Sequence, residues 1–212
     1  MNSSGRPLAG LIAGAARLIS GVNVRWLDSQ PDTAQRVYFA NHTSHLDFVV
    51  LWSSLPQPVR AVTRPVAAHD YWEKGLRRAL AVSVFRALLV ARRKDMTPDG
   101  TVAAARDTID HIVEEMGDRY SLIIFPEGTR GTGEEVQPFK SGLYYLCQRK
   151  PGLPLVPAYI NNLNRILPKG EFLPVPFISQ LTFGPAMQLE TGEDKTSFLT
   201  RAREAVCRLK QI

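Results

Sequence analysis

Cysteine is scarce in this 212-residue sequence, and its two cysteines, Cys147 and Cys207, lie far apart without a CxxC pattern. A disulfide framework or a cysteine-based zinc site needs more thiols at closer spacings. We therefore expect two plain buried thiols in a protein of a reducing compartment. Long apolar runs are absent too, since no uninterrupted stretch reaches the ~18 residues that a membrane-spanning helix requires.

Acidic residues are also few, because 20 Asp and Glu face 26 Lys and Arg, which gives a net charge of +6. The excess is concentrated between Arg60 and Lys94, where nine cations accompany only Asp70 and Glu73. Apolar and aromatic residues are threaded through the same segment. This mixture fits a membrane-facing helix better than a nucleic-acid site, and a plain solvated surface is the alternative. We expect a membrane partner and no nucleic acid.

The N-terminal region adds a second membrane signal. Leu8 to Val22 is apolar except for Arg17 and Ser20, and Arg6 precedes this stretch. A short signal peptide has a similar pattern, but the glycines, the low hydrophobicity and Arg17 favour an interfacial helix. We expect residues 1–30 to be a membrane-associating segment of a peripheral protein on the cytoplasmic face of the inner membrane.

Short β-type runs alternate with helix-length amphipathic runs, which predicts an α/β fold with a mainly parallel central sheet flanked by helices. We expect a single domain over residues 1–212. Strands are expected at Val37–Ala40, Val59–Thr63, Leu88–Arg92, Leu122–Phe125, Leu155–Ile160 and Leu181–Phe183. Helices are expected from Thr97-Pro98-Asp99 to a stop at Gly117, and from about Asp194 to Lys210. Two proline-rich stretches predict loops, at Pro56–Pro58 and Pro168–Pro176.

The first chemical motif directly follows the strand expected at Val37–Ala40 and contains Asn41, His42 and Asp47. In an open α/β sheet, functional sites collect at this end of the strands. An alcohol is a poor nucleophile at neutral pH, and an imidazole, with an unperturbed pKa of about 6.5, can remove its proton. A carboxylate on the other ring nitrogen fixes the tautomer and stabilises the imidazolium. We predict that His42 is a general base and that Asp47 orients it.

A metal site of His42, His45 and Asp47 is the alternative for this motif. Common zinc sites have a further ligand at a recognisable spacing, and the only other histidines are His69 and His111. We therefore expect no metal, and we interpret His45 as a neighbour of the base.

The second motif, Phe125-Pro126-Glu127-Gly128-Thr129-Arg130, ends another expected strand. Gly128 lets the backbone approach a ligand, Thr129 offers a hydroxyl, and Arg130 can form bidentate hydrogen bonds to phosphate. Glu127 would repel phosphate, so that it either accepts from a substrate hydroxyl or holds a neighbouring arginine. A turn with a surface ion pair is the alternative interpretation.

These motifs resemble those of the phospholipid/glycerol acyltransferase family, whose best-known members are the 1-acylglycerol-3-phosphate acyltransferases. The NHxxxxD block of that family matches Asn41, His42 and Asp47, and its FPEGTR block matches Phe125 to Arg130 without a change. The FKxG that follows matches Phe139, Lys140 and Gly142, and Leu155 to Tyr159 looks like a fourth block. The resemblance spans about residues 37–160, the motif-bearing core, and implies a fold similar to that of glycerol-3-phosphate acyltransferases.

The resemblance also implies residue roles. In that family the histidine of the first block is the base and the aspartate orients it, in agreement with the argument above. The second block of the family corresponds to the residues from Ala87 to Arg93, which depart from the family pattern. Either Arg92 or Arg93 could bind phosphate there. The predicted substrate-binding set is Arg92, Arg93, Glu127, Gly128, Thr129, Arg130 and Lys140.

We therefore expect an O-acyltransferase of phospholipid biosynthesis that needs no cofactor beyond its acyl donor, acyl carrier protein or coenzyme A thioester. The favoured acceptor is 1-acyl-sn-glycerol-3-phosphate, which would give phosphatidic acid. Glycerol 3-phosphate and a lyso-aminolipid are alternative acceptors. A non-catalytic peripheral lipid-binding protein and a hydrolase that activates water are the rival functions.

Overall fold

The computed structural model describes residues 5–44, 46–68, 80–90, 100–161 and 179–211. Seven strands form one sheet in the order β1-β7-β6-β2-β5-β3-β4. In chain order they are β1 (Asn23–Trp26), β2 (Val37–Ala40), β3 (Thr63–Ala68), β4 (Leu88–Val90), β5 (Ser121–Ile124), β6 (Leu155–Asn161) and β7 (Gln180–Phe183). The strands from β6 to β4 are parallel, whereas β7 is antiparallel to β6 and pairs in parallel with β1 at the edge. The predicted α/β fold with a mainly parallel sheet is confirmed.

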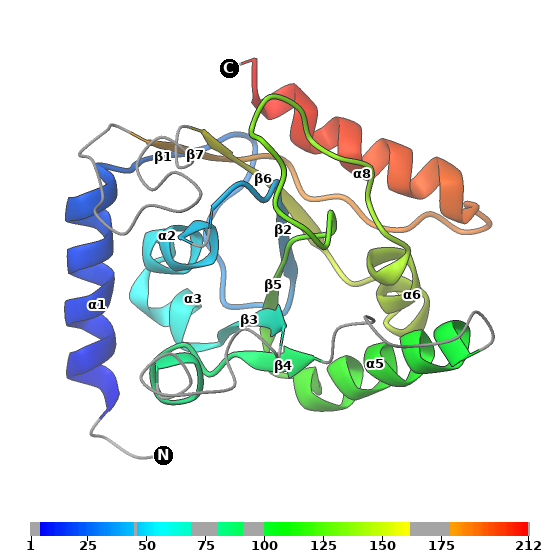
Figure 1. The fold of residues 1–212 in the computed structure, drawn as a ribbon, viewed down its shortest axis with the longest axis horizontal. Coiled ribbons are helices and arrows are strands. Elements are labelled where there is room, and N and C mark those ends of the chain that lie inside the picture. The colour runs from blue at the N-terminus through cyan, green and yellow to red at the C-terminus, as the bar shows by residue number, and fades with distance from the viewer. Residues whose placement is uncertain (1–4, 45, 69–79, 91–99, 162–178, 212) are drawn as a thin grey trace.

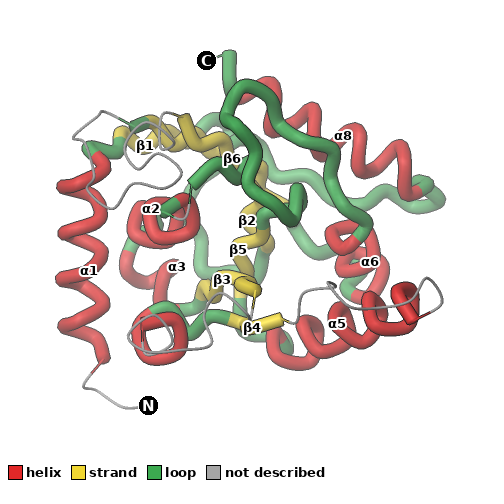
Figure 2. The backbone as a smooth tube through the Cα atoms, viewed as in Figure 1, coloured by secondary structure: helices red, strands yellow, loops and turns green. Residues whose placement is uncertain are grey.

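Helices cover both faces of this sheet (Figures 1 and 2). One group comprises α1 (Gly5–Ser20), α2 (Asp47–Ser54), α3 (Gln57–Ala61) and a π-helical turn, η2 (Leu80–Val84). The other comprises α5 (Gly100–Met116), α6 (Gly142–Arg149) and α8 (Lys195–Leu209). None of the helices in the described ranges is long and apolar enough to span a bilayer.

The central strand β2 divides the apolar core into two layers. Every residue of β2 is buried, as expected for a parallel strand covered on both faces. Successive side chains of a strand point to opposite faces. Val37 and Phe39 accordingly join the core under α5, α6 and α8, whereas Tyr38 and Ala40 join the core under α1 and α2.

One strand prediction is wrong, and one strand was not predicted. The residues Val59–Thr63 do not form a strand, because α3 runs over Gln57–Ala61 and β3 begins only at Thr63. Pro58 lies in the first turn of α3, where a proline costs no hydrogen bond. The loop predicted at Pro56–Pro58 is therefore correct only for Pro56, which precedes the helix. The edge strand β1 was missed because its residues are only partly buried and lack an apolar run.

The other elements agree with the sequence within a few residues. Gly117 follows α5 with a φ of +52°, and Asp194 caps α8 by accepting from the N–H groups of Thr196 and Ser197. The predicted helix start at Thr97–Asp99, the loop at Pro168–Pro176 and much of the basic segment lie outside the described residues. Where that segment is described, it contains strands and short helical turns in place of one long helix.

The two cysteines differ in their surroundings and should differ in reactivity. Burial raises the pKa of the Cys147 thiol to about 12, whereas Cys207 is only partly buried. Because the thiolate is the reactive form, we expect iodoacetamide at pH 8 to alkylate Cys207 at least about 10-fold faster than Cys147 in the folded protein. Peptide mass spectrometry would measure both rates, with urea-unfolded protein as the control. Equal rates in the folded protein would contradict the placement of Cys147.

Candidate active site

The first loop of the site runs from the end of β2 to the start of α2 and begins with a fixed residue, Asn41. Its side chain is buried and bonds both main-chain groups of Ile160 on the neighbouring strand. The Nδ2 group donates to the Ile160 carbonyl at 2.9 Å, and Oδ1 accepts from the Ile160 N–H at 2.8 Å. Asn41 therefore holds the carboxyl end of β2 against β6, where the loop begins.

His42 and Asp47 meet across this loop. The His42 Nδ1 atom lies 2.9 Å from Oδ2 of Asp47, whose side chain is fully buried. The same oxygen accepts from the N–H groups of Thr43 at 2.5 Å and Ser44 at 2.8 Å. Because Oδ2 already accepts two hydrogen bonds, Nδ1 must supply the hydrogen to the third. The unprotonated nitrogen of a neutral ring is then Nε2, and the imidazole side chain is 22% exposed.

The second loop, from the end of β5 to α6, contacts His42 on three sides. The imidazole stacks on Phe125 with the ring centres 4.5 Å apart. The His42 N–H donates to Oε1 of Glu127 at 2.6 Å, and the His42 carbonyl accepts from the Gly131 N–H at 2.8 Å. The second loop therefore fixes the ring and both main-chain polar groups of His42.

Glu127 is buried, and both of its carboxylate oxygens accept hydrogen bonds from within the protein. It is only 3% exposed, and its second oxygen, Oε2, accepts from the Gln137 N–H at 2.9 Å. Burial raises the pKa of Glu127, and the hydrogen bonds from Gln137 and His42 oppose this rise. No arginine of the described ranges pairs with its carboxylate. The proposed arginine contact is therefore not seen in this part of the protein.

The last three residues of the second motif, Gly128, Thr129 and Arg130, are exposed. Gly128 has a φ of +67°, and a Cβ at this position would lie 2.9 to 3.0 Å from the side chain of Lys140. Glycine thus permits both the backbone conformation and the close approach of a cation. Thr129, Arg130 and Lys140 are exposed to solvent. Gly128 and Lys140 are side by side in the structure, which their separation in the sequence does not reveal.

Other predicted site residues lie outside the described residues, namely His45, Arg92 and Arg93. The phosphate-binding role of the two arginines stays a prediction. Within the described ranges, no group of three or more His, Cys, Asp or Glu side chains is arranged to hold a metal ion.

Sequence reasoning missed Gly131 and Gln137, which bond the site through main-chain N–H groups. Gly131 directly follows the second motif, and this adjacency is the only sequence signal that marks it. Nothing in the sequence marks Gln137, because any residue except proline supplies an N–H group.

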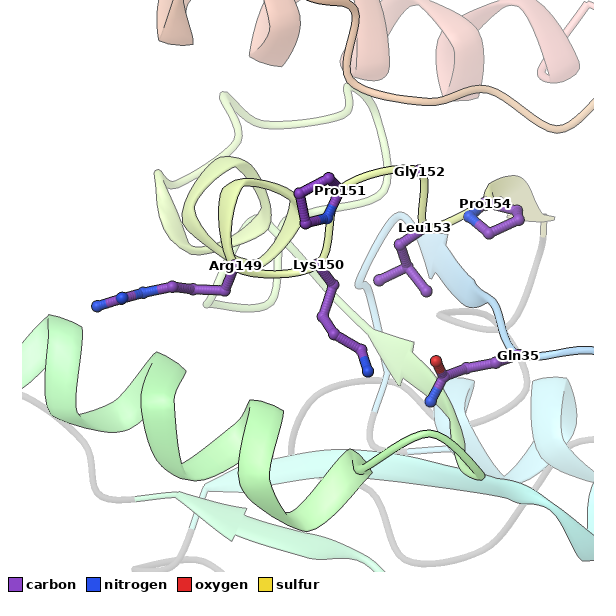
Figure 3. Close-up of a pocket in the computed structure, with 7 residues that line it drawn as sticks. All are labelled: Gln35, Arg149, Lys150, Pro151, Gly152, Leu153 and Pro154. Carbon is purple, nitrogen blue, oxygen red and sulfur yellow. The ribbon is translucent and has the colours of Figure 1, made fainter.

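A cavity of about 300 Å³ lies away from this site (Figure 3). Its lining includes Gln35 and Pro154, which precede β2 and β6, so it opens at the amino ends of the strands, whereas His42 follows the carboxyl end of β2. Lys150 and Gln35 point toward each other across it, and both donate to the Gly117 carbonyl. The cavity therefore takes no part in the site around His42.

Comparison with known proteins gives consistent results at three levels. A model of the acyltransferase family matches residues 21–161, which contain both motifs. The sequence is 26% identical over 169 residues to a 1-acyl-sn-glycerol-3-phosphate acyltransferase of Limnanthes douglasii, with 78% of this chain and 56% of that protein covered. It is 28% identical over 159 residues to the Escherichia coli (strain K12) protein of the same name, with 68% and 58% covered. The chain thus spans less than two thirds of the length of these relatives.

A crystal structure shares the fold. The 1-acyl-sn-glycerophosphate (LPA) acyltransferase PlsC from Thermotoga maritima superposes with a TM-score of 0.72. The match covers 97% of this chain and 80% of that chain, at 18% sequence identity. At this identity the likeness establishes the architecture alone.

The placement of Asn41 predicts a stability effect. Asn41→Ala would leave the buried N–H and carbonyl groups of Ile160 without partners, and we expect it to lower the free energy of unfolding by roughly 2–3 kcal/mol. Asn41→Asp keeps the acceptor but places a second acceptor against the Ile160 carbonyl, so we expect it to lower stability at least as much as Asn41→Ala. Urea denaturation would measure all three proteins. The exposed Asn23→Ala serves as the control and should change stability by less than about 0.5 kcal/mol; an equal effect of Asn41→Ala would refute the bridging role.

Proposed function

The chain belongs to the acyltransferase family, and we propose that it transfers a fatty acyl group from a thioester to the free hydroxyl of a lysophospholipid. The proposed acceptor is 1-acyl-sn-glycerol-3-phosphate, and the product is phosphatidic acid, because the relatives described above are named for that activity. The donor is acyl-coenzyme A or acyl carrier protein. The observation that carries the proposal is the contact of His42 Nδ1 with buried Asp47, which leaves Nε2 as the basic atom.

The reaction needs one proton transfer and one acyl transfer. Nε2 of His42 removes the hydroxyl proton while the alcohol oxygen attacks the thioester carbonyl. The new ester C–O bond forms, the C–S bond breaks, and the imidazolium returns the proton to the departing sulfur. Asp47 keeps the ring in the correct tautomer and stabilises its transient positive charge. No acyl-enzyme is required, because the acceptor itself is the nucleophile.

The exposed groups of the second loop would hold the phosphate of the acceptor. Arg130 offers a bidentate donor pair, Lys140 a second cation and Thr129 a hydroxyl, and all three face solvent. Gly128 gives an anion access to the backbone beside Lys140. Arg92 or Arg93 would complete this set.

We also propose that α1 attaches the protein peripherally to a membrane, on the cytoplasmic face of the inner membrane. One side of α1 packs on α2 through Ala13, and Nε of Arg17 donates to the Ser53 carbonyl at 2.6 Å. The other side leaves four large apolar side chains exposed: Leu8 at 47%, Leu11 at 71%, Leu18 at 85% and Ile19 at 46%. An apolar helix face of this kind can enter the lipid headgroup boundary without crossing the bilayer.

Removal of the base tests the chemistry. We expect His42→Ala to reduce turnover at least ~10²–10⁴-fold, the usual contribution of a general base. Purified wild type and variant would receive acyl-coenzyme A and acyl carrier protein thioesters with lysophosphatidate, glycerol 3-phosphate or lyso-aminolipids, and mass spectrometry would identify the products. Near-wild-type turnover by a folded variant would rule out the assigned base. Fatty acid release without acceptor dependence would instead indicate a hydrolase, and vesicle binding without turnover a lipid-binding protein.

A charge introduced on the exposed apolar face of α1 tests the membrane role. Leu11→Asp and Leu18→Asp should each weaken binding to phosphatidylcholine/phosphatidylglycerol vesicles by roughly 10-fold or more, because each removes a buried leucine from the lipid. Sedimentation with vesicles would measure the bound fraction. Ala186→Asp adds the same charge at an exposed site outside α1 and should bind like wild type. Equal binding by all four proteins would exclude α1 as the attachment.

A further inference from the structure

Glu127 shares a motif with the proposed phosphate-binding residues but not their surroundings. Gly128, Thr129 and Arg130 are exposed, whereas Glu127 is 3% exposed. A side chain that binds the acceptor must be reachable from solvent or from the membrane. The burial of Glu127 therefore separates its role from that of the three residues that follow it.

Both carboxylate oxygens of Glu127 are occupied by main-chain N–H groups. Oε1 accepts from His42 and Oε2 from Gln137. Among side chains of this length, only a carboxylate presents two acceptors and no donor. A glutamine would place an NH₂ group against one of the two N–H groups. The site thus requires a glutamate for its geometry, although burying a carboxylate costs free energy.

The bond from His42 to Glu127 is one of a pair. The His42 N–H donates to Glu127, and the His42 carbonyl accepts from Gly131. Residues 128–130 lie between these two anchors, so both ends of the exposed segment are tied to the main chain of the same residue. A displacement of the segment would therefore move the base, and a displacement of the base would move the segment.

We propose that Glu127 is a positioning residue that fixes the distance between the general base His42 and the phosphate-binding segment 128–130, and that it does not itself bind the acceptor. This inference rests on the proposed function and assigns Glu127 a different role from the one its motif suggests. The carboxylate ties His42 on one side and Gln137 on the other, so that the second loop closes around the base. The hydroxyl to be deprotonated and the phosphate to be held belong to one acceptor molecule, and their separation is set by its covalent structure. The two protein groups that act on them must keep a matching separation.

The electrostatic setting agrees with this role. Glu127 interacts electrostatically with His42, and burial raises the pKa of its carboxyl while the two N–H donors oppose that rise. A second carboxylate near the ring, besides Asp47, favours the imidazolium that forms during the reaction. A glutamate carboxylate that faced the acceptor phosphate would weaken acceptor binding, because the two negative charges repel each other.

We call the two hydrogen bonds that Glu127 accepts, from the N–H groups of His42 and Gln137, the clamp. Two variants disrupt it, one at the carboxylate and one at a donor. Glu127→Gln keeps the size of the side chain and removes one acceptor. Gln137→Pro removes the N–H that Oε2 accepts, at an exposed residue, without changing Glu127. Glu135→Gln alters an exposed carboxylate of the same loop and is the matched control.

The first readout is hydrogen exchange of the substrate-free proteins. We expect both clamp variants to raise exchange at least about 10-fold in peptides that contain His42 and Gly131, because each variant loses a hydrogen bond to a charged group. Peptides of α8 should exchange as in wild type. Unchanged exchange around His42 and Gly131 in both variants would overturn the proposal. An equal increase in α8 would also overturn it, since it would indicate general destabilisation.

The second readout is steady-state kinetics with lysophosphatidate and acyl-coenzyme A. A misplaced base lowers kcat, and we expect a fall of roughly 10²-fold in kcat in both variants, together with a higher KM for the acceptor. A rise in acceptor KM alone in Glu127→Gln, with Gln137→Pro like the control, would instead show direct acceptor binding and refute the inference. If wild type transfers no acyl group, the proposed function fails, whereas hydrogen exchange still decides whether the clamp exists.

Discussion

The parallel pairing of β2 with β5 is the constraint on which the site depends. Phe39 lies opposite Ile124, so the two strands end at the same edge of the sheet and the loops that follow them begin side by side. Each loop alone is incomplete, since the first holds the base and the second holds its main-chain anchors. The pairing is secure because β2 is buried on both faces and bonded on its other side to β6. The chemistry thus rests on a strand whose residues are all buried.

Two buried carboxylates lie beside His42, and main-chain N–H groups stabilise each of them. Asp47 accepts from Thr43 and Ser44 in addition to the imidazole, and Glu127 accepts from His42 and Gln137. Main-chain donors are fixed by the fold, whereas a lysine or arginine side chain could leave. A carboxylate held in this way keeps its position while the ring gains and loses a proton. This arrangement suits a base that must return to the same geometry after each turnover.

The sequence predicted those features that depend on local patterns. The strand that precedes His42 is a continuous apolar run, and the contact of His42 with Asp47 spans a single loop. Features that depend on long-range pairing were missed. The edge strand β1 has no apolar run of its own, and the partner of Glu127 is a main-chain group of Gln137 that no residue type marks. The strand expected at Val59–Thr63 failed because the periodicity of so short an apolar run does not distinguish a strand from a helix, and only packing does.

Burial divides the second motif into two functional halves, although its residues are contiguous. The more buried half, Phe125 and Glu127, contacts His42, so a change there should affect the reaction with every acceptor alike. Among the described residues, the exposed side chains of Thr129 and Arg130 make no hydrogen bond to His42, so a change of these side chains should alter which head group is accepted. Acceptor preference can therefore change within this fold while the more buried half stays the same. Positioning of the base and binding of the head group use different residues of the same motif. The motif in the sequence contains the residues for both roles, and only the three-dimensional structure shows which residue has which role.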